Sequence, residues 1–433
     1  MTTRPSIAFV GMTHLGIVHA AAAAAKGFDV VAFDQDAQRV ADLVAGRLPV
    51  LEPDLPELLA AHAARLRFTS DPSDLETVPL CYVAPDVATD AQGRSDLTIL
   101  LELIALAERN LTSEAVLVVL SQVPPGFTRG LSHPVAKRFY QVETLIFGRA
   151  VERALQPERF ILGCADPAAP LPSVLADFLA AFGCPLLPMG WESAELSKIA
   201  INLFLVSSIS TTNMVADLCE RIGADWGEIA PALRLDRRIG PHAYLTPGLG
   251  IAGGNLERDL AGFRRLAGET GAGAASIDVW IRDAARRRDW ALRILHEHVF
   301  RDDPGGRLAV LGLAYKENTR STRNSPALAL LNALGGKEVA VWDPEVPADA
   351  VARPGLRGAA DALDACEGAC ALVIMTPWPE FRRLDPMRIA ERLGGRTVID
   401  PWRLLSTSAV RAAGLRHFVL GAPPSDPLDA REK

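Results

Sequence analysis

Cysteine is scarce in this 433-residue chain, which contains six. The one close pair, Cys366 and Cys370, has the four-residue spacing of a helix, with no second pair and no histidine nearby. A structural zinc site needs four such ligands, so we expect no metal. Small buried thiols in a reducing compartment fit this usage better, and we expect a cytoplasmic protein.

An excess of positive charge is also absent, because 45 Lys and Arg face 52 Asp and Glu, which gives a net charge of −7. Non-specific binding to nucleic acids and to anionic membranes needs a basic face, so we expect neither partner. An anionic substrate would instead need a local group of Arg, Lys and helix N-termini.

Long uninterrupted apolar runs are missing too. The stretch 199–209 contains Asn202 and Ser207, is too short to cross a bilayer, and is interpreted as a buried helix. The apolar N-terminal segment carries His14 and His19, so it is interpreted as a strand, a turn and a helix and not as a signal peptide. No internal period indicates a repeat architecture.

With 49% hydrophobic and 22% charged residues, the chain has the composition of a globular protein with a hydrophobic core. Its length suits two or three domains. Alternating strand and helix patterns predict an α/β domain over 1–190. Helical patterns, interrupted by a glycine-rich loop at 247–254, predict a central region over 191–300. A second strand–helix–strand pattern predicts a smaller α/β domain over 301–433.

These patterns together predict an α/β protein in which two Rossmann-like, doubly wound domains are joined by a central helical region with a long helix. The strands expected in the two domains are 6–10, 30–34, 80–84, 115–120 and 160–164, and then 308–313, 338–342, 371–375 and 397–399.

The first strand–helix–strand pattern carries a candidate dinucleotide site. Gly11 and Gly16 occupy the outer positions of its turn, and Thr13 occupies the middle one. The middle position normally lets the backbone approach a phosphate, so the β-branched Thr13 is expected to obstruct it. Asp34 ends the second strand and is expected to bind ribose hydroxyls, which favours NAD over NADP. The alternative is a doubly wound sheet that binds no dinucleotide.

Further segments carry a family resemblance that holds in order from about residue 6 to about residue 420. They are 27–34 with 48–53, 121–126 (Ser-Gln-Val-Pro-Pro-Gly), 194–198 (Ala-Glu-Leu-Ser-Lys) with Asn202 and Asn213, 310–319 (Val-Leu-Gly-Leu-Ala-Tyr-Lys-Glu-Asn-Thr) with Arg323, Ser325 and Pro326, and 378–381 (Trp-Pro-Glu-Phe). In these segments the chain resembles the UDP-glucose and UDP-N-acetylmannosamine dehydrogenase family.

The resemblance implies an N-terminal NAD-binding domain, a central helix that forms a homodimer interface, and a C-terminal domain that holds a nucleotide sugar. It also implies a role in polysaccharide or glycoside biosynthesis. Family members oxidise the sugar C6 alcohol twice with NAD. A cysteine thiolate attacks the aldehyde formed first, and the thiohemiacetal loses a second hydride before hydrolysis.

The resemblance also places catalytic residues on this chain. Lys198 and Asn202, four apart on one helix face, correspond to groups that stabilise an oxyanion at the reacting carbon. Asp259 corresponds to an acid that positions water and takes up a proton, and Gln122 replaces a threonine beside that water. Asn255 stands where the family has its nucleophilic cysteine. Without the resemblance, Lys198 would be interpreted as a surface residue and Asn202 as a capping or core residue.

The remaining contacts are also implied by the resemblance. The cofactor contacts are Gly11, Thr13, His14, Leu15, Gly16, Asp34, Arg39 and Ser121, and the substrate contacts are Glu143, Tyr244, Gly248, Gly250, Gly253, Lys316 and Arg323. His14 has an alternative interpretation, as a loop histidine packed on its own backbone. The departures from the family are Phe147 in place of an acid, Glu257 and Arg258 in place of Pro and Lys, and Trp402 and Arg403 in place of Arg and Asn.

An amide cannot form a thiohemiacetal, so Asn255 predicts a single two-electron oxidation of a nucleotide-linked alcohol. One alternative is a catalytically inactive homologue that binds a nucleotide sugar as a regulator or partner subunit. The other is a redox-neutral epimerase, in which the hydride returns to the opposite face. The sequence leaves open the nucleotide, the sugar and the carbon that is oxidised.

Overall fold

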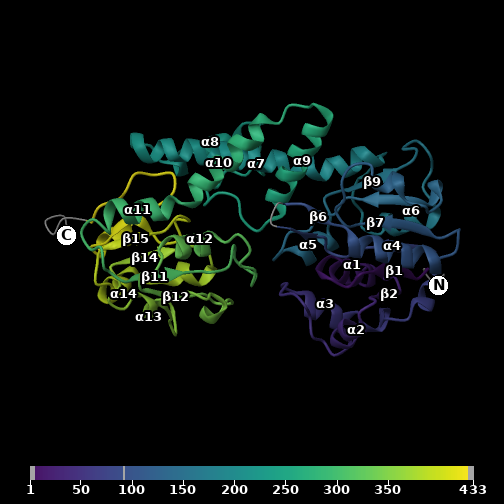
Figure 1. Cartoon of the computed structure of the whole chain (residues 1–433), viewed down its shortest axis with the longest axis horizontal. Coiled ribbons are helices and arrows are strands. Elements are labelled where there is room, and N and C mark those ends of the chain that lie inside the picture. Colours follow the sequence, from purple (N-terminus) through teal and green to yellow (C-terminus); the bar gives the residue numbers. More distant parts are fainter. Residues whose placement is uncertain (1–4, 91–92, 428–433) are drawn as a thin grey trace. The chain divides into compact units, whose positions relative to one another are not determined.

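The computed structural model describes residues 5–90 and 93–427 (Figure 1). The chain divides into two compact units, one up to Ile201 and one from Asn202 onward. The division falls inside the long helix α7 (Trp191–Ile222). The predicted division into 1–190, 191–300 and 301–433 stays a prediction, whereas the two α/β sheets lie where the sequence predicts them.

The first unit contains an eight-stranded sheet in the order β10-β9-β8-β7-β4-β1-β2-β3, parallel except for the β8–β9 pair. Its strands are β1 (Ile7–Val10), β2 (Val30–Phe33), β3 (Leu66–Thr69), β4 (Leu80–Val83), β7 (Val116–Val119), β8 (Arg138–Gln141), β9 (Phe160–Cys164) and β10 (Leu186–Gly190). The inner strands β1, β4 and β7 are wholly buried and apolar, as expected for parallel strands covered on both faces.

Helices surround that sheet. They are α1 (His14–Ala25), α2 (Ala37–Val44), α3 (Leu55–Ala61), α4 (Thr98–Asn110), α5 (Ala150–Leu155) and α6 (Ser173–Ala180), and a small hairpin consists of β5 (Ala88–Thr89) and β6 (Ser95–Asp96). Ala20 to Ala24 of α1 are fully buried, because side chains this small let the helix pack closely on the sheet. α2 begins after Asp36, whose carboxylate accepts from two first-turn amides.

Helix α7 is much longer than the apolar stretch 199–209 from which a helix is predicted. It runs for 32 residues and is apolar and long enough, by length and composition alone, to cross a membrane. The stretch 199–209 is helical, as predicted, but it is only partly buried, since Ile199 and Val206 are buried whereas Phe204 is 79% exposed. Beyond this stretch, Met214, Leu218 and Ile222 of the same helix are exposed too. A long helix whose apolar face packs on another protein surface has the same length and composition as a helix that crosses a membrane.

The second unit combines helices with a second sheet. The helices are α8 (Trp226–Leu235), α9 (Asn255–Thr270), α10 (Ala275–Arg288), α11 (Trp290–His298), α12 (Pro326–Ala333), α13 (Ala362–Cys366), α14 (Pro386–Arg392) and α15 (Thr407–Ala412). The strands are β11 (Leu308–Leu311), β12 (Val339–Trp342), β13 (Leu356–Gly358), β14 (Ala371–Ile374), β15 (Thr397–Ile399) and β16 (Arg416–Phe418).

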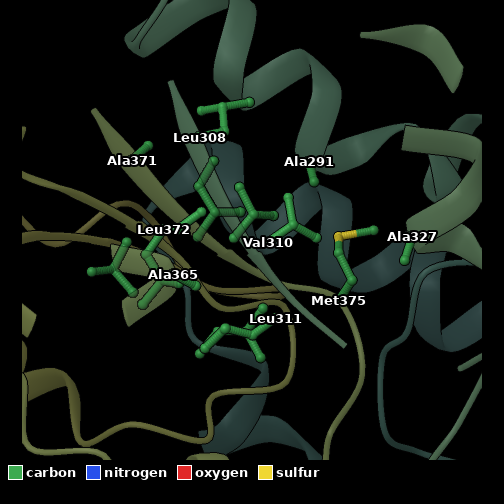
Figure 2. Packing of buried hydrophobic residues seen from close by; sticks show 14 of the residues in the cluster. Ala291, Leu308, Val310, Leu311, Ala327, Ala365, Ala371, Leu372 and Met375 are labelled. Atoms are coloured by element: carbon green, nitrogen blue, oxygen red, sulfur yellow. The ribbon is translucent and has the colours of Figure 1, made fainter. Parts of the chain in front are cut away.

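This second sheet is fully parallel, in the order β13-β12-β11-β14-β15-β16. Its core lies around β11 and β14, where α11, α12 and α13 contribute the small side chains Ala291, Ala327 and Ala365 (Figure 2). The strand order reverses between β11 and β14, which is the position where such sheets open a crevice for ligands.

The same local arrangement, a glycine turn held by an aspartate, occurs in both sheets. After β1 and β11 the chain turns at Gly11 and Gly312, with φ of 96° and 91°. The residue that follows each glycine donates its N–H to an aspartate at the end of the next strand, Asp34 or Asp343, at 2.7 and 2.6 Å. Each aspartate thus fixes its turn, which explains why an acid recurs at this point in both domains.

Candidate active site

The turn after β1 lies at the carboxyl edge of the first sheet, next to the loops after β4 and β7. Glycine is required twice in it. A side chain on Gly16 would come within 1.9 Å of the Gly11 carbonyl, and one on Gly11 would come within 2.9 Å of Pro85. The loops are tied together because the Ser121 hydroxyl donates to the Pro85 carbonyl at 2.6 Å. Three strand ends therefore form one rigid edge at the strand-order reversal.

Thr13 fits this turn without backbone strain, since its φ of −90° and ψ of −168° are ordinary extended values. Its hydroxyl accepts the N–H of Asp86 at 2.7 Å and so links the turn to the loop after β4. A threonine here therefore replaces the open space of a glycine by a hydrogen bond between two loops.

Asp34 is 1% exposed and accepts four hydrogen bonds. The N–H groups of Met12 and Asp36 use one oxygen each, and the Arg39 guanidinium lies 2.9 and 3.0 Å from the two oxygens. These contacts fill the carboxylate's capacity. Arg39, a partner of Asp34, is partly exposed to solvent. Leu15, the other predicted contact here, is buried.

His14 is not packed on its own backbone. It opens α1, its ring stacks on Phe147 at a centroid distance of 4.2 Å, and its Nε2 lies 2.9 Å from Glu52. Glu52 also accepts the amides of Gly148 and Ala150 at 3.0 and 2.8 Å. The imidazole therefore braces α1 against the segment that carries Phe147, and Glu52, which the sequence reasoning missed, is the centre of this cluster.

Taken together, these residues fit a bound dinucleotide. The glycine turn, the N-terminus of α1 and the acid after β2 are the parts that hold a pyrophosphate and a ribose. The hydrogen bond of Thr13 narrows the space in which a phosphate would approach the backbone, but it leaves the glycine turn after β1 intact.

Lys198 and Glu143 meet in the first unit. The Lys198 ammonium donates to the Glu143 carbonyl at 3.0 Å and lies 3.3 Å from its carboxylate. Gln122 lies on the neighbouring loop, which ends against Glu195 of α7. The Glu195 carboxylate is fully buried and accepts the N–H groups of Gly126 and Thr128 at 2.6 and 2.8 Å.

Burial raises the pKa of Glu195 above the usual carboxyl value, against the effect of those two amides. Its role is positional, because it fixes the end of the 121–126 loop to α7. Glu195 lies in the Ala-Glu-Leu-Ser-Lys segment that carries part of the family resemblance. No spacing in the sequence, however, predicts the loop amides that Glu195 binds.

Asn202 and Asp259 meet in the second unit, where the Asn202 amide donates to the Asp259 carboxylate. Asp259 is 3% exposed, and Arg258 lies 3.3 Å from its other oxygen. Asn255 is the first residue of α9, follows Gly254 in the left-handed conformation, and is exposed. Because Asn255 and Asp259 are four residues apart in one helix, they occupy the same face of α9.

The glycines before α9 are explained by the 315–324 segment. A side chain on Gly253 would lie 2.6 Å from the Tyr315 ring, and one on Gly254 would lie 2.8 Å from Arg323. Lys316 places its ammonium 5.6 Å from that same ring centroid. The predicted substrate contacts Gly253, Lys316 and Arg323 are therefore brought together in one place.

The earlier part of the loop is held by α7. The Gly248 amide donates to Asn213 at 2.9 Å, and the Tyr244 carbonyl accepts hydroxyls of Ser208 and Thr212 at 3.0 Å each. The ring of Tyr244 itself is exposed. Gly250 has a φ of 77° and lies against the Ala284 carbonyl of α10. Sequence reasoning noted Asn213 only as part of a resemblance and did not foresee this role.

None of the six cysteines lies in the 247–259 loop, and all six belong to the described part of the chain. Burial raises the pKa of every thiol, to about 12 for Cys81 and Cys366 and to about 11 for Cys370. A thiolate nucleophile needs the opposite environment. Among residues 5–90 and 93–427, no cluster of His, Cys, Asp and Glu has the arrangement of a metal site.

Two doubly wound sheets, each with a glycine turn and a terminal aspartate, define a protein with two nucleotide-binding folds. Sequence profiles of the UDP-glucose/GDP-mannose dehydrogenase family match the chain in three parts: the NAD binding domain over residues 5–176, the central domain over 192–282 and the UDP binding domain over 309–407. The chain belongs to this family of NAD-dependent dehydrogenases that act on nucleotide sugars.

Comparisons with individual relatives lead to the same family. UDP-glucose 6-dehydrogenase TuaD of Bacillus subtilis is 29% identical, with 96% of this chain and 93% of that protein covered. UDP-glucose 6-dehydrogenase of Rhizobium meliloti is also 29% identical, with 96% and 99% covered. The structure of a UDP-glucose dehydrogenase from Pyrobaculum islandicum matches with a TM-score of 0.80, 27% identity, and 93% and 96% coverage. The predicted family, fold class and cofactor, NAD, are confirmed.

Proposed function

We propose that this chain uses NAD to oxidise a CH–OH group of a nucleotide sugar once and stops at the aldehyde or ketone. One observation carries the proposal: Asn255, and not a cysteine, opens α9 on the face that carries Asp259. A carboxamide cannot add to an aldehyde as a thiolate does, so the covalent step needed for a second oxidation is missing.

The remaining groups suffice for one oxidation. NAD, when bound, accepts the hydride from the carbinol carbon. Lys198 and Asn202, one turn apart on α7, supply a cation and an amide donor that stabilise negative charge on the alcohol oxygen. Asp259, which accepts a hydrogen bond from Asn202, receives the hydroxyl proton directly or through water in this proposal. Lys316 and Arg323 match the charge of a diphosphate.

The test is a count of NADH formed per nucleotide sugar consumed, with NAD and a panel of UDP-glucose, UDP-N-acetylmannosamine, GDP-mannose and a dTDP-sugar. We expect one equivalent and a carbonyl product that a hydrazine reagent traps. Asp259→Asn is expected to lower the rate at least 100-fold. Glu269→Gln, an exposed position on the same helix, serves as the matched control and is expected to leave the rate unchanged.

Other stoichiometries contradict the proposal. Two equivalents of NADH would mean that a second oxidation occurs without the cysteine. No NADH with a changed sugar would favour the epimerase, and no NADH with tight binding of a nucleotide sugar would favour an inactive regulatory homologue.

We further propose that the chain forms a homodimer through α7. The exposed apolar residues Met214, Leu218 and Ile222 recur every four positions and so form one stripe, and Phe204 lies further along the same helix. A self-complementary stripe of this kind suits a twofold interface between two copies of the chain. We also propose that the protein acts in the cytoplasm, since its cysteines are all free thiols.

A further inference from the structure

A pocket in the second unit lies between α7, the loop at 250–251 and the helices α10 and α11, and Gly250 is the one proposed nucleotide-sugar contact that lines it. Its apolar lining residues are Ile209, Met214, Ile251 and Ala284, of which Met214 also belongs to the exposed stripe of α7. The charged lining residues are three arginines and two aspartates. The charged and polar lining residues are Ser210, Asn213, Asp217, Asp283, Arg286, Arg287 and Arg293.

Arg287 is the unusual member of this lining. Its side chain is only 4% exposed. One terminal nitrogen pairs with Glu220 at 2.5 Å, and the other lies 3.5 Å from Asp217, beyond a good hydrogen bond. Its Nε and Nη1 have no hydrogen-bond partner among the described residues. Unmade hydrogen bonds on a buried cation are costly, so these donors call for an acceptor in the pocket.

Two further arginines crowd the same space. Arg286 lies 2.9 Å from Asp217, and Arg293 donates to the Arg286 carbonyl. Burial lowers the pKa of Arg293, and the nearby Arg286 lowers it further. The acids cancel only part of this charge, because Glu220 pairs with Arg287, Asp217 is shared among Arg221, Arg286 and Arg287, and Asp283 is exposed.

We propose that this pocket binds an oxyanion, a phosphate group that is either free or carried by a small metabolite. Guanidinium groups hold such an ion through several parallel N–H···O bonds, which is the donor geometry that Arg286, Arg287 and Arg293 offer. The apolar lining residues then give room for the carbon part of a phosphate ester.

The pocket is coupled to the catalytic loop by direct contacts. Gly250 and Ile251 form part of its wall, and Asn213, another lining residue, holds the Gly248 amide. The same loop continues into Asn255 and α9. An ion that clamps α7 to α10 therefore stiffens the loop that presents Asn255, which gives the ligand a means to change the affinity for the nucleotide sugar.

The test is equilibrium binding of radiolabelled inorganic phosphate to the full-length protein at constant ionic strength, with saturating UDP-glucose present so that the substrate site is filled. We expect saturable binding in the parent protein. Arg293→Gln is expected to weaken it at least tenfold. Arg282→Gln removes an exposed arginine of α10 that does not line the pocket and is the control, with binding expected to match the parent.

Arg287→Met would also remove the guanidinium partner of Glu220 and leave that carboxylate with only the Trp290 indole and the Gly421 amide, so Arg293→Gln is the variant that tests the site. Absence of saturable binding, equal binding by Arg293→Gln and the parent, or displacement of phosphate by UDP-glucose would each overturn the proposal. Competition with glucose 1-phosphate and with glucose distinguishes the sources: a sugar phosphate that competes better than phosphate identifies an ester, and equal competition identifies the free ion. The measurement needs no turnover, so its outcome is independent of the proposed oxidation.

Discussion

Glu52 is a buried carboxylate surrounded by hydrogen-bond donors. Burial by itself would raise its pKa, but the bond from His14 and the amides of Ala150 and Gly148 outweigh burial, and the pKa lies below its usual value of 4.5. The folded protein therefore binds a proton at Glu52 less readily than the unfolded chain does. This stabilisation is present at neutral pH and is lost as the pH falls below 4.5 through the lowered pKa.

We predict that Glu52→Gln destabilises the protein by about 1–3 kcal/mol at pH 7, because a buried donor then faces an NH₂ group. The deficit relative to the parent should shrink as the pH falls toward 4. Urea unfolding followed by circular dichroism at several pH values measures both effects. Glu102→Gln, at an exposed site on α4, is the control and should change little. A deficit that grows on acidification would contradict this account.

At the scale of elements, the 247–254 loop and the start of α9 depend on the 315–324 segment. Gly253 and Gly254 have φ of 91° and 102°, and Tyr315 and Arg323 fill the space that a side chain would occupy. Further along, Glu257 accepts a hydrogen bond from Asn324. The catalytic loop is therefore shaped by residues about sixty positions later in the chain.

We predict that Gly253→Ala weakens binding of UDP at least tenfold, because an L-residue at this φ costs about 1–2 kcal/mol and the added methyl group displaces Tyr315. Isothermal titration with UDP measures the loss. Gly262→Ala is the matched control on α9, where a methyl group meets open space and should stabilise the helix by about 0.5–1 kcal/mol. Unchanged UDP affinity in Gly253→Ala would show that the loop does not contact the nucleotide.

At the scale of the whole molecule, the exposed apolar stripe of α7 is the surface on which the proposed homodimer depends. Burial of a stripe that includes Met214, Leu218 and Ile222 against its own copy would remove each of these side chains from water, at roughly 1.5–3 kcal/mol per fully buried side chain.

We predict that the parent protein sediments as a dimer and that Met214→Lys combined with Leu218→Lys shifts it to the monomer at micromolar concentration. Two lysines per copy would place like charges in an apolar interface. Val44→Lys, at an exposed apolar site on α2, should leave the dimer intact. Sedimentation velocity distinguishes the species, and a parent that sediments as a monomer would end the proposal.

Much of the fold follows from short-range pattern. The buried strands β1, β2, β4 and β9 are apolar runs bounded by glycine or polar residues, so their positions were predictable to within a residue or two. Strands such as β3 and β10 were not predicted, because both are short and largely unburied, β3 contains Arg67 and β10 contains Pro188. They become strands by pairing with β2 and β9.

The candidate site, like the fold, is partly determined by the sequence and partly by the tertiary structure. The sequence by itself determined which chemical groups are available: a glycine turn, a terminal Asp34, a lysine and an asparagine one helical turn apart, and an amide at 255 where the family has a thiol. Only the tertiary structure decided which of them meet. It joined Asn202 to Asp259, set Phe147 on His14, and left the buried donors of Arg287 in a pocket. The physical reason is that hydrogen bonds, ring stacking and burial act over a few ångströms in space, and the partners lie tens of residues apart in the chain.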